Sequence, residues 1–148
     1  MNKVIYSMIS VVLLLMSPAL AFELKVGMKA SDWSFEDSKK NIFTMANWAG
    51  KVLLVNYVDP DIVKKAKDEG RLKDETYRGI RIADCAATWK PNFAIRVIAA
   101  KKAKKYKTTI LFDYKAVLHK AWRLKKDTAN VILLDKNKVC QAIVRGRV

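Results

Sequence analysis

The stretch Lys51–Lys67, KVLLVNYVDPDIVKKAK, decides the fold. It opens with an apolar run, Val52–Val58, bounded by a glycine and a proline. A short run rich in Val and Leu, without a polar face, predicts a strand buried on both sides. Asp59 can cap backbone N–H groups and Pro60 suits a first helical position, so a helix is expected from Pro60 to about Leu72. The segment predicts a strand running into a helix N-terminus, where many folds place their chemistry.

The flanking sequence predicts an alternation of strands and helices. Trp33 and Phe35 alternate with polar residues, which indicates a strand, and Ile42–Met45 can return beside it. Further expected elements are a strand at Gly79–Asp84, a helix at Asn92–Lys107, a strand at Thr108–Phe112, a helix at Ala116–Trp122 and a strand hairpin at Val131–Leu134 and Val139–Val144. This order predicts one α/β sandwich with a mixed sheet, in which Gly79–Asp84 lies nearer the edge than Val52–Val58.

The expected helix Asn92–Lys107 has an apolar and a basic side. Asn92 is a candidate N-cap. The expected apolar arc consists of Phe93, Val97, Ala99, Ala100, Ala103 and Tyr106. On the other side lie Lys101, Lys102 and Lys105, with Ile98 among them. These three lysines are candidate binding residues for a polyanion, although such clusters are usually solvated faces.

The first 21 residues have the features of a secretory signal peptide. Lys3 precedes the apolar core Val4–Met16, Pro18 breaks it, and small residues precede Phe22. The core is shorter than the roughly 20 residues that span a bilayer. We therefore expect cleavage after Ala21, a periplasmic location, a single mature domain at 22–148, and no integral membrane segment after cleavage.

The chain is strongly basic, with a net charge of +15 at pH 7, and loss of Lys3 with the signal peptide leaves +14. Export argues against nucleic acid as the partner. The remaining polyanions are acidic proteins and anionic components of the envelope. A generic basic surface with no specific partner stays an equal alternative.

The sequence resembles a known group of exported proteins. The run LKVGMKASDWSFEDSKKNIFTMANWAGKVLLVNYVDPD and the run FDYKAVLHKAWRLKKDTANVILLDKNKV are similar to the two halves of thioredoxin-like and peroxiredoxin-like domains. The segment AWRL…ANVILLDKNKV and the signal peptide resemble the YtfJ family of small periplasmic proteins. The resemblance implies a thioredoxin-like α/β/α sandwich with a mixed central sheet and an extra N-terminal β-hairpin. The DKNK turn lacks the usual glycine.

The sequence departs from this family at the redox position. A thioredoxin has Cys-x-x-Cys at the N-terminus of the helix that follows the first core strand, where the helix dipole lowers the pKa of the attacking thiol. Here that position holds Asp59-Pro60-Asp61-Ile62, and the position of the family's cis-proline holds Ala129. The resemblance therefore implies a fold without dithiol chemistry, and no cofactor is expected.

The two cysteines, Cys85 and Cys140, would suggest a disulfide in an exported protein. The family's strand order instead separates them by three strand spacings, about 14 Å, whereas a disulfide needs Cα atoms within about 7 Å. We expect two unpaired thiols. Cys85 ends the second core strand, so it is a candidate catalytic or sensing thiol. The alternative is a structural cysteine, which Asp84 favours because a neighbouring carboxylate raises a thiol pKa.

Other site chemistry has little support in the sequence. His119 is the only histidine, so a zinc site is not expected. Asp59, Asp61 and Asp84 could gather at one sheet edge, but capping and turn solvation explain them without a metal. Two hypotheses remain. The first is a YtfJ-type binding or accessory module without oxidoreductase activity, and the second is a thiol redox protein that uses Cys85.

Overall fold

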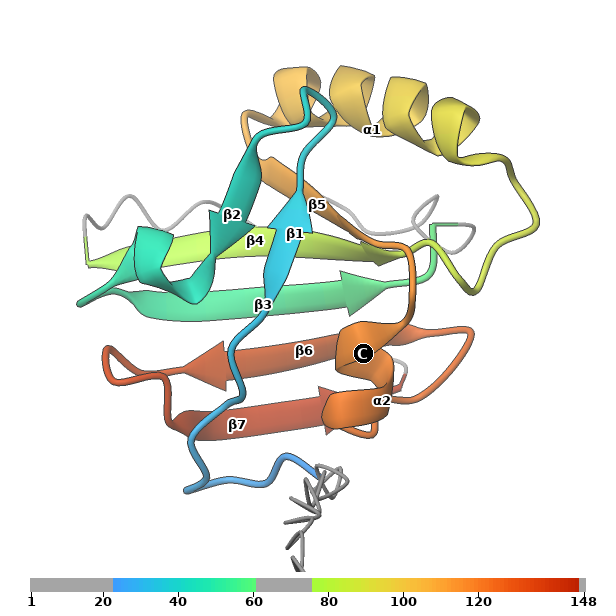
Figure 1. Cartoon of the computed structure of the whole chain (residues 1–148). Coiled ribbons are helices and arrows are strands. Elements are labelled where there is room, and N and C mark those ends of the chain that lie inside the picture. Colours follow the sequence, from blue (N-terminus) through green and yellow to red (C-terminus); the bar gives the residue numbers. More distant parts are fainter. Residues whose placement is uncertain (1–22, 61–75, 147–148) are drawn as a thin grey trace, which may run out of the picture.

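The computed structural model describes residues 23–60 and 76–146, and within them it contains one mixed seven-stranded sheet (Figure 1). The strand order is β2-β1-β5-β4-β3-β6-β7. The strands are β1 (Ser34–Glu36), β2 (Ile42–Thr44), β3 (Val52–Val58), β4 (Tyr77–Asp84), β5 (Thr109–Asp113), β6 (Ala129–Leu134) and β7 (Cys140–Arg145). The helices are η1 (Met45–Trp48), α1 (Asn92–Tyr106) and α2 (Val117–Ala121).

Strand β3 lies inside the sheet, as the sequence predicts. It pairs in parallel with β4 and antiparallel with β6. Leu53, Val55 and Tyr57 are almost completely buried, whereas the alternate residues of β3 are only partly buried. The sequence predicts burial on both sides, and the structure shows one face fully buried and the other partly buried. The continuous apolar run reflects a strand hydrogen-bonded along both edges, with one fully covered face.

The β4 strand is not near the edge, contrary to the expectation from its alternating sequence. It lies between β3 and β5 and is parallel to both. Its alternation instead separates two faces. Ile80 and Ile82 enter one hydrophobic cluster, while Ala83 packs on another. Polar and small residues can thus occupy an interior strand where one face is less deeply covered.

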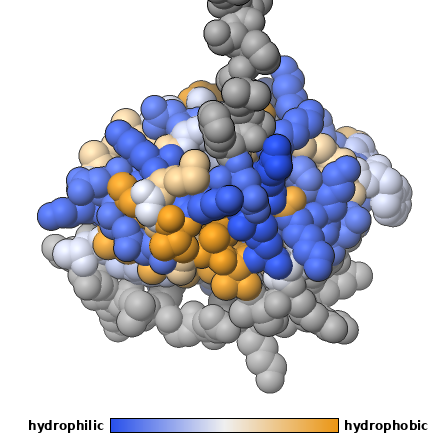
Figure 2. Space-filling view, turned by 90° about the horizontal axis from the view of Figure 1, so that it is seen from below, coloured by the Kyte–Doolittle hydropathy of each residue, from blue (hydrophilic) through white to orange (hydrophobic). Residues whose placement is uncertain are grey.

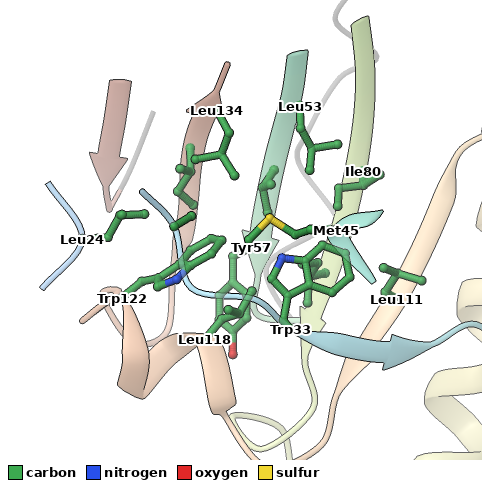
Figure 3. Close-up of a cluster of buried hydrophobic side chains, with 14 of the residues drawn as sticks. Leu24, Trp33, Met45, Leu53, Tyr57, Ile80, Leu111, Leu118, Trp122 and Leu134 are labelled. Atoms are coloured by element: carbon green, nitrogen blue, oxygen red, sulfur yellow. The ribbon is translucent and has the colours of Figure 1, made fainter. Parts of the chain in front are cut away.

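The larger core covers the sheet face that carries α2 and the N-terminal aromatic residues (Figure 3). Leu118 of α2 is almost fully buried there, and so are Trp122, which follows α2, and Trp33, which precedes β1. The Trp33 and Phe35 rings stack at 5.3 Å, and the Trp122 indole N–H donates to the Ser31 hydroxyl at 2.9 Å. The N-terminal aromatic residues Trp33 and Phe35 are therefore core residues.

The smaller core lies under α1, on the opposite face. In β5, Leu111 belongs to the larger core, while its neighbours Ile110 and Phe112 belong to the smaller one. Since successive strand residues point to opposite faces, the two helices lie on different sides of the sheet. Ile95 and Ala99 are the residues of α1 that are buried against it.

The orientation of α1 differs from the predicted apolar arc. Phe93, Val97 and Ala100 are exposed, whereas Ile95, which the prediction omitted, is 4% exposed. The isolated helix has aliphatic residues on several sides, so its periodicity did not identify the buried one. The predicted cap is also wrong: Asn92 is the first helical residue, and Pro91 precedes it in extended conformation without a side-chain cap.

The segment before β1 pairs with the chain at the start of the edge strand β7. Backbone hydrogen bonds join Gly27 to Cys140 at 2.8 Å and Ala30 to Lys138 at 2.9 Å. Seen from the β7 side, an apolar area lies among hydrophilic residues (Figure 2). Val144 of β7 is exposed. This edge is therefore only partly covered by the described residues.

Some predictions fall outside the described residues. They are the signal peptide and most of the helix expected from Pro60 to Leu72, which includes Asp61. Among the helices of residues 23–60 and 76–146, none has the length and apolar character needed to cross a bilayer.

Candidate functional site

A buried polar cluster lies where β3, β4 and β5 end. Tyr57 is near the end of β3, Asp84 ends β4 and Asp113 ends β5. These strands are parallel, so their carboxyl ends share one edge, which is the usual place of function in open α/β sheets. The three residues are between 0 and 5% exposed.

Asp113 organises the start of α2. Its carboxylate accepts hydrogen bonds from the backbone N–H groups of Val117 at 2.8 Å and Leu118 at 2.9 Å. It also accepts one from the Tyr57 hydroxyl at 3.0 Å. A buried carboxylate needs several such donors to compensate for lost hydration. A structural role, which is to hold the start of α2 and the Tyr57 side chain in place, therefore explains why a carboxylate is buried here.

Asp84 faces the histidine of α2. The His119 Nδ1 atom lies 3.6 Å from Asp84 Oδ2 and has no hydrogen-bond partner of its own. Burial raises the pKa of Asp84, and His119 opposes that rise. Sequence reasoning considered His119 only as an isolated metal ligand. Only the topology could have indicated this pair, because Asp84 ends β4 and His119 lies in the helix after β5, and both reach the same edge of the sheet.

Cys85 is close to this cluster but is poorly suited to thiol chemistry. It is 7% exposed, and its Sγ lies 3.5 Å from the Ala83 carbonyl oxygen. Burial, followed by the nearby carboxylates of Asp84 and Asp113, raises the pKa of the thiol to about 12. The thiolate is the nucleophilic form, so Cys85 is almost entirely in its inactive form near neutral pH.

The strand order predicted from the family resemblance is confirmed around the cysteines. Cys85 follows β4, and Cys140 begins β7, with β3 and β6 between the two strands. Both cysteines are buried and unpaired. No disulfide therefore links the end of the interior strand β4 to the edge strand β7.

The candidate carboxylates only partly come together. Asp59 is buried, and burial, then Asp127, raises its pKa, while Lys90 opposes the rise. Asp59 also contributes to the raised pKa of Asp84, so the two carboxyls are neighbours. Asp61 lies outside the described residues. Within 23–60 and 76–146, no group of three His, Cys, Asp or Glu side chains is placed to hold a metal ion.

The three candidate lysines of α1 do not share one environment. Lys101 and Lys105 are exposed, whereas Lys102 is partly buried and lines a pocket beneath the helix. The sequence had placed all three on one solvated side. A helix advances 100° per residue, so Lys102 turns toward the sheet while Lys101 continues the outward face.

The pocket under α1 has a volume of about 130 Å³. It is bounded by β3, β4, β5 and α1, and Pro60 contributes to it. Its walls are mostly apolar, while Arg81, Lys90 and Lys102 supply cationic groups. It lies next to the strand end that precedes Asp59.

Comparisons with known proteins agree with the architecture. No protein-family model and no curated protein matches the chain. A hypothetical protein from Sinorhizobium meliloti 1021 is 22% identical with a TM-score of 0.64, covering 84% of this chain and 72% of its own. A thiol peroxidase from Chromobacterium violaceum is 13% identical with a TM-score of 0.60 and coverages of 84% and 78%.

The thioredoxin domain of a thiol-disulfide oxidoreductase from Bacteroides vulgatus is also similar. It is 17% identical with a TM-score of 0.60, and the match covers 84% of this chain and 91% of that one. At such identities the likeness concerns the fold. The chain therefore has an α/β thioredoxin-like fold, as the resemblance implied.

Proposed function

We propose that this chain is an exported, periplasmic thioredoxin-fold protein of the YtfJ type that works as a binding module without dithiol chemistry. The observation that supports this proposal is the absence of cysteines directly after β3, together with the burial of the nearby Cys85 thiol. Asp59-Pro60 follows β3, where oxidoreductases of the family have cysteines, and the nearby thiol, Cys85, is buried with a pKa raised to about 12. The burial and raised pKa of Cys85 also weigh against the alternative, a redox protein that uses this thiol.

The binding surface that we propose is the outward face of α1. Phe93 and Val97 are 71% and 53% exposed, and Lys101 follows at the same four-residue spacing. Trp89, just before the helix, is 86% exposed. Residues four apart share a helix face, so Phe93, Val97 and Lys101 form one surface, opposite buried Ile95.

Charge favours an anionic partner. From Cys85 to Phe112 the sequence has seven Lys and Arg residues and no Asp or Glu. A solvated basic face would explain the lysines, but not a tryptophan and a phenylalanine that project beside them. Aromatic residues next to lysines suit the headgroup region of an anionic membrane, where rings insert and ammonium groups meet phosphates. We therefore favour an anionic lipid surface over an acidic protein.

Vesicle binding tests this surface. The mature chain should co-sediment with phosphatidylglycerol vesicles, not with phosphatidylcholine vesicles, and salt should weaken the binding. Trp33, Trp48 and Trp122 are buried, so a blue shift of tryptophan fluorescence on binding would report Trp89. Trp89→Phe should abolish the shift.

Matched variants separate the docking face from overall charge. Lys101→Gln/Lys105→Gln should weaken vesicle binding about tenfold or more, since each lysine near an anionic surface contributes about 1 kcal/mol. Lys25→Gln/Lys39→Gln removes the same charge from exposed sites elsewhere and should change it much less. Equal effects of the two pairs would overturn the docking face. Binding to polyglutamate without any vesicle binding would assign the face to an acidic protein instead.

The absence of redox chemistry has its own test. The mature protein should not accelerate insulin reduction by dithiothreitol, and Cys85→Ser should leave vesicle binding unchanged. Clear turnover that Cys85→Ser abolishes would support the alternative. Fractionation of cells that express the whole chain would test the periplasmic location.

A further inference from the structure

The exposed side chains of α1 change in character along the helix. In its first two turns they are apolar: Phe93, Val97 and Ile98 are 71%, 53% and 43% exposed. In its second half the exposed side chains are those of Ala100, Lys101, Lys104 and Lys105. The helix contains no acidic residue. Its outer surface therefore has an apolar end and a basic end.

These two ends lie on one face of the helix. Ile95 and Ala99 are buried against the sheet. At 100° per residue, Phe93, Val97 and Lys104 lie within about 40° of one another on the opposite side. A rise of about 1.5 Å per residue places Phe93 and Lys104 about 16 Å apart along the axis. Because α1 is the outer layer on its side of the sheet (Figure 1), this face is open to a partner.

The basic end has no acidic partner among residues 23–60 and 76–146. The ion pairs of this part of the chain involve none of Lys101, Lys104 and Lys105. The Lys105 ammonium group lies 5.2 Å from the centre of the Tyr106 ring. The apolar end is extended by Trp89, which is 86% exposed and stands three residues before the helix. One end of α1 therefore offers rings for burial, and the other offers ammonium groups for anions.

We propose that α1 docks on an anionic bilayer in a tilted orientation, with its N-terminal end among the acyl chains and its lysines at the lipid phosphates. This inference rests on the proposed docking face and specifies which end of that face enters the bilayer. The partner is a lipid layer whose acyl chains are accessible, because a soluble polyanion would engage the basic end alone.

The separation of the two ends favours a tilt over a flat orientation. In a flat orientation the rings and the ammonium groups would lie at one depth, and the cost of dehydrating the ammonium groups would oppose insertion of the rings. A tilt of about 25° separates Phe93 and Lys104 in depth by about 7 Å, within the roughly 5–10 Å to which interfacial helices are buried. The tilt therefore lets the rings insert while the lysines stay hydrated.

The depth of an introduced tryptophan tests the tilt. Phe93→Trp and Ala100→Trp, each combined with Trp89→Phe, place an exposed indole at one of two positions about 10 Å apart along the helix, without changing its charge. The other tryptophans are buried and are the same in both proteins. In phosphatidylglycerol vesicles with bromine midway along the acyl chains, the Phe93→Trp protein should be quenched at least twofold more strongly. Equal quenching of the two bound proteins would overturn the tilt and leave membrane docking standing, whereas no binding of the wild type would overturn both.

An exchange of two residues tests the order of the two ends. Phe93→Lys/Lys104→Phe keeps the composition and the net charge of the face but reverses its order. The exchange should weaken binding to phosphatidylglycerol vesicles at least fivefold, while binding to polyglutamate, which has no apolar layer, should stay within twofold. Both positions are exposed, and circular dichroism checks that the variant is folded. Unchanged vesicle affinity, or an equal loss of affinity for vesicles and polyglutamate, would contradict the proposal.

Discussion

The Tyr57 hydroxyl donates a buried hydrogen bond of 3.0 Å to the Asp113 carboxylate. Tyr57 belongs to β3 and Asp113 ends β5, so the bond spans the position of β4, which lies between them. The same carboxylate accepts the N–H groups of Val117 and Leu118. One side chain thus connects the central strand, the end of β5 and the first turn of α2.

Removing this hydrogen bond should destabilise the fold without unfolding it. Tyr57→Phe keeps the ring and removes the hydroxyl, so we expect the free energy of unfolding to fall by about 1.5–3 kcal/mol, as for a hydrogen bond to a charged group. Asp113→Ala should lower the free energy of unfolding further. It leaves the backbone N–H groups of Val117 and Leu118 without their acceptor at the start of α2, and it leaves the Tyr57 hydroxyl buried without a partner. Urea denaturation measures both. A larger loss for Tyr57→Phe than for Asp113→Ala would contradict this account.

A second prediction concerns Lys138, which stands where the family's turn usually has glycine. Lys138 has a φ of +64°, and its ammonium group donates to the carbonyl oxygens of Trp48 at 2.9 Å and Lys51 at 2.8 Å. These hydrogen bonds offset the strain of the left-handed backbone. Lys138→Gly should therefore destabilise the protein by about 2 kcal/mol, although it relieves that strain.

Lys40 provides the matched control. It has nearly the same φ, +66°, but is exposed in the turn between β1 and β2. Its side chain stabilises no buried carbonyl group in the described structure, so Lys40→Gly should be neutral or stabilising by up to about 1 kcal/mol. Thermal denaturation of the two glycine variants compares them directly. The idea fails if both variants shift the melting temperature in the same direction by similar amounts.

The sequence predicted the path of the chain better than the faces of its elements. Apolar runs and the family resemblance predicted the strands around β3, the hairpin at β6 and β7, and the separation of Cys85 from Cys140. The sequence did not predict the buried side of α1, because Phe93, Val97 and Ile95 are all apolar and only packing against β5 distinguishes them. The Asp84–His119 pair likewise depends on which strand ends lie side by side, and the local spacing of residues in the sequence does not predict this.

A third prediction follows from the state of Cys85. Its pKa of about 12 implies a thiolate fraction near one in ten thousand at pH 8, far below that of an ordinary cysteine with a pKa of about 8.5. In the Cys140→Ala variant, iodoacetamide should modify native Cys85 at least about a thousandfold more slowly than the urea-unfolded chain. Mass spectrometry over time gives both rates. Native labelling within tenfold of the unfolded rate would show that the thiol is accessible and ionised.

The fourth prediction uses the pH dependence of stability. Burial raises the pKa of Asp84 in the folded chain, so the folded state binds this proton more tightly than the unfolded state. Its contribution to stability is complete below the unfolded pKa, near about 3.9, and is lost as pH rises through the folded pKa. Asp84→Asn retains an oxygen for the Ala86 N–H and removes the titration. The stability of this variant relative to the wild type should therefore increase from about pH 4 to pH 7.

His119 sets the size of this effect. It opposes the rise in the Asp84 pKa, so His119→Leu should raise that pKa further and steepen the fall of stability with pH. In the double variant, the Asn at position 84 should abolish the added pH dependence, because no titrating carboxyl remains there. Urea denaturation at half-unit pH intervals measures all four proteins. If the Asp84→Asn curve runs parallel to the wild-type curve throughout this range, Asp84 does not carry the shifted proton, and the pair with His119 has no electrostatic role in folding.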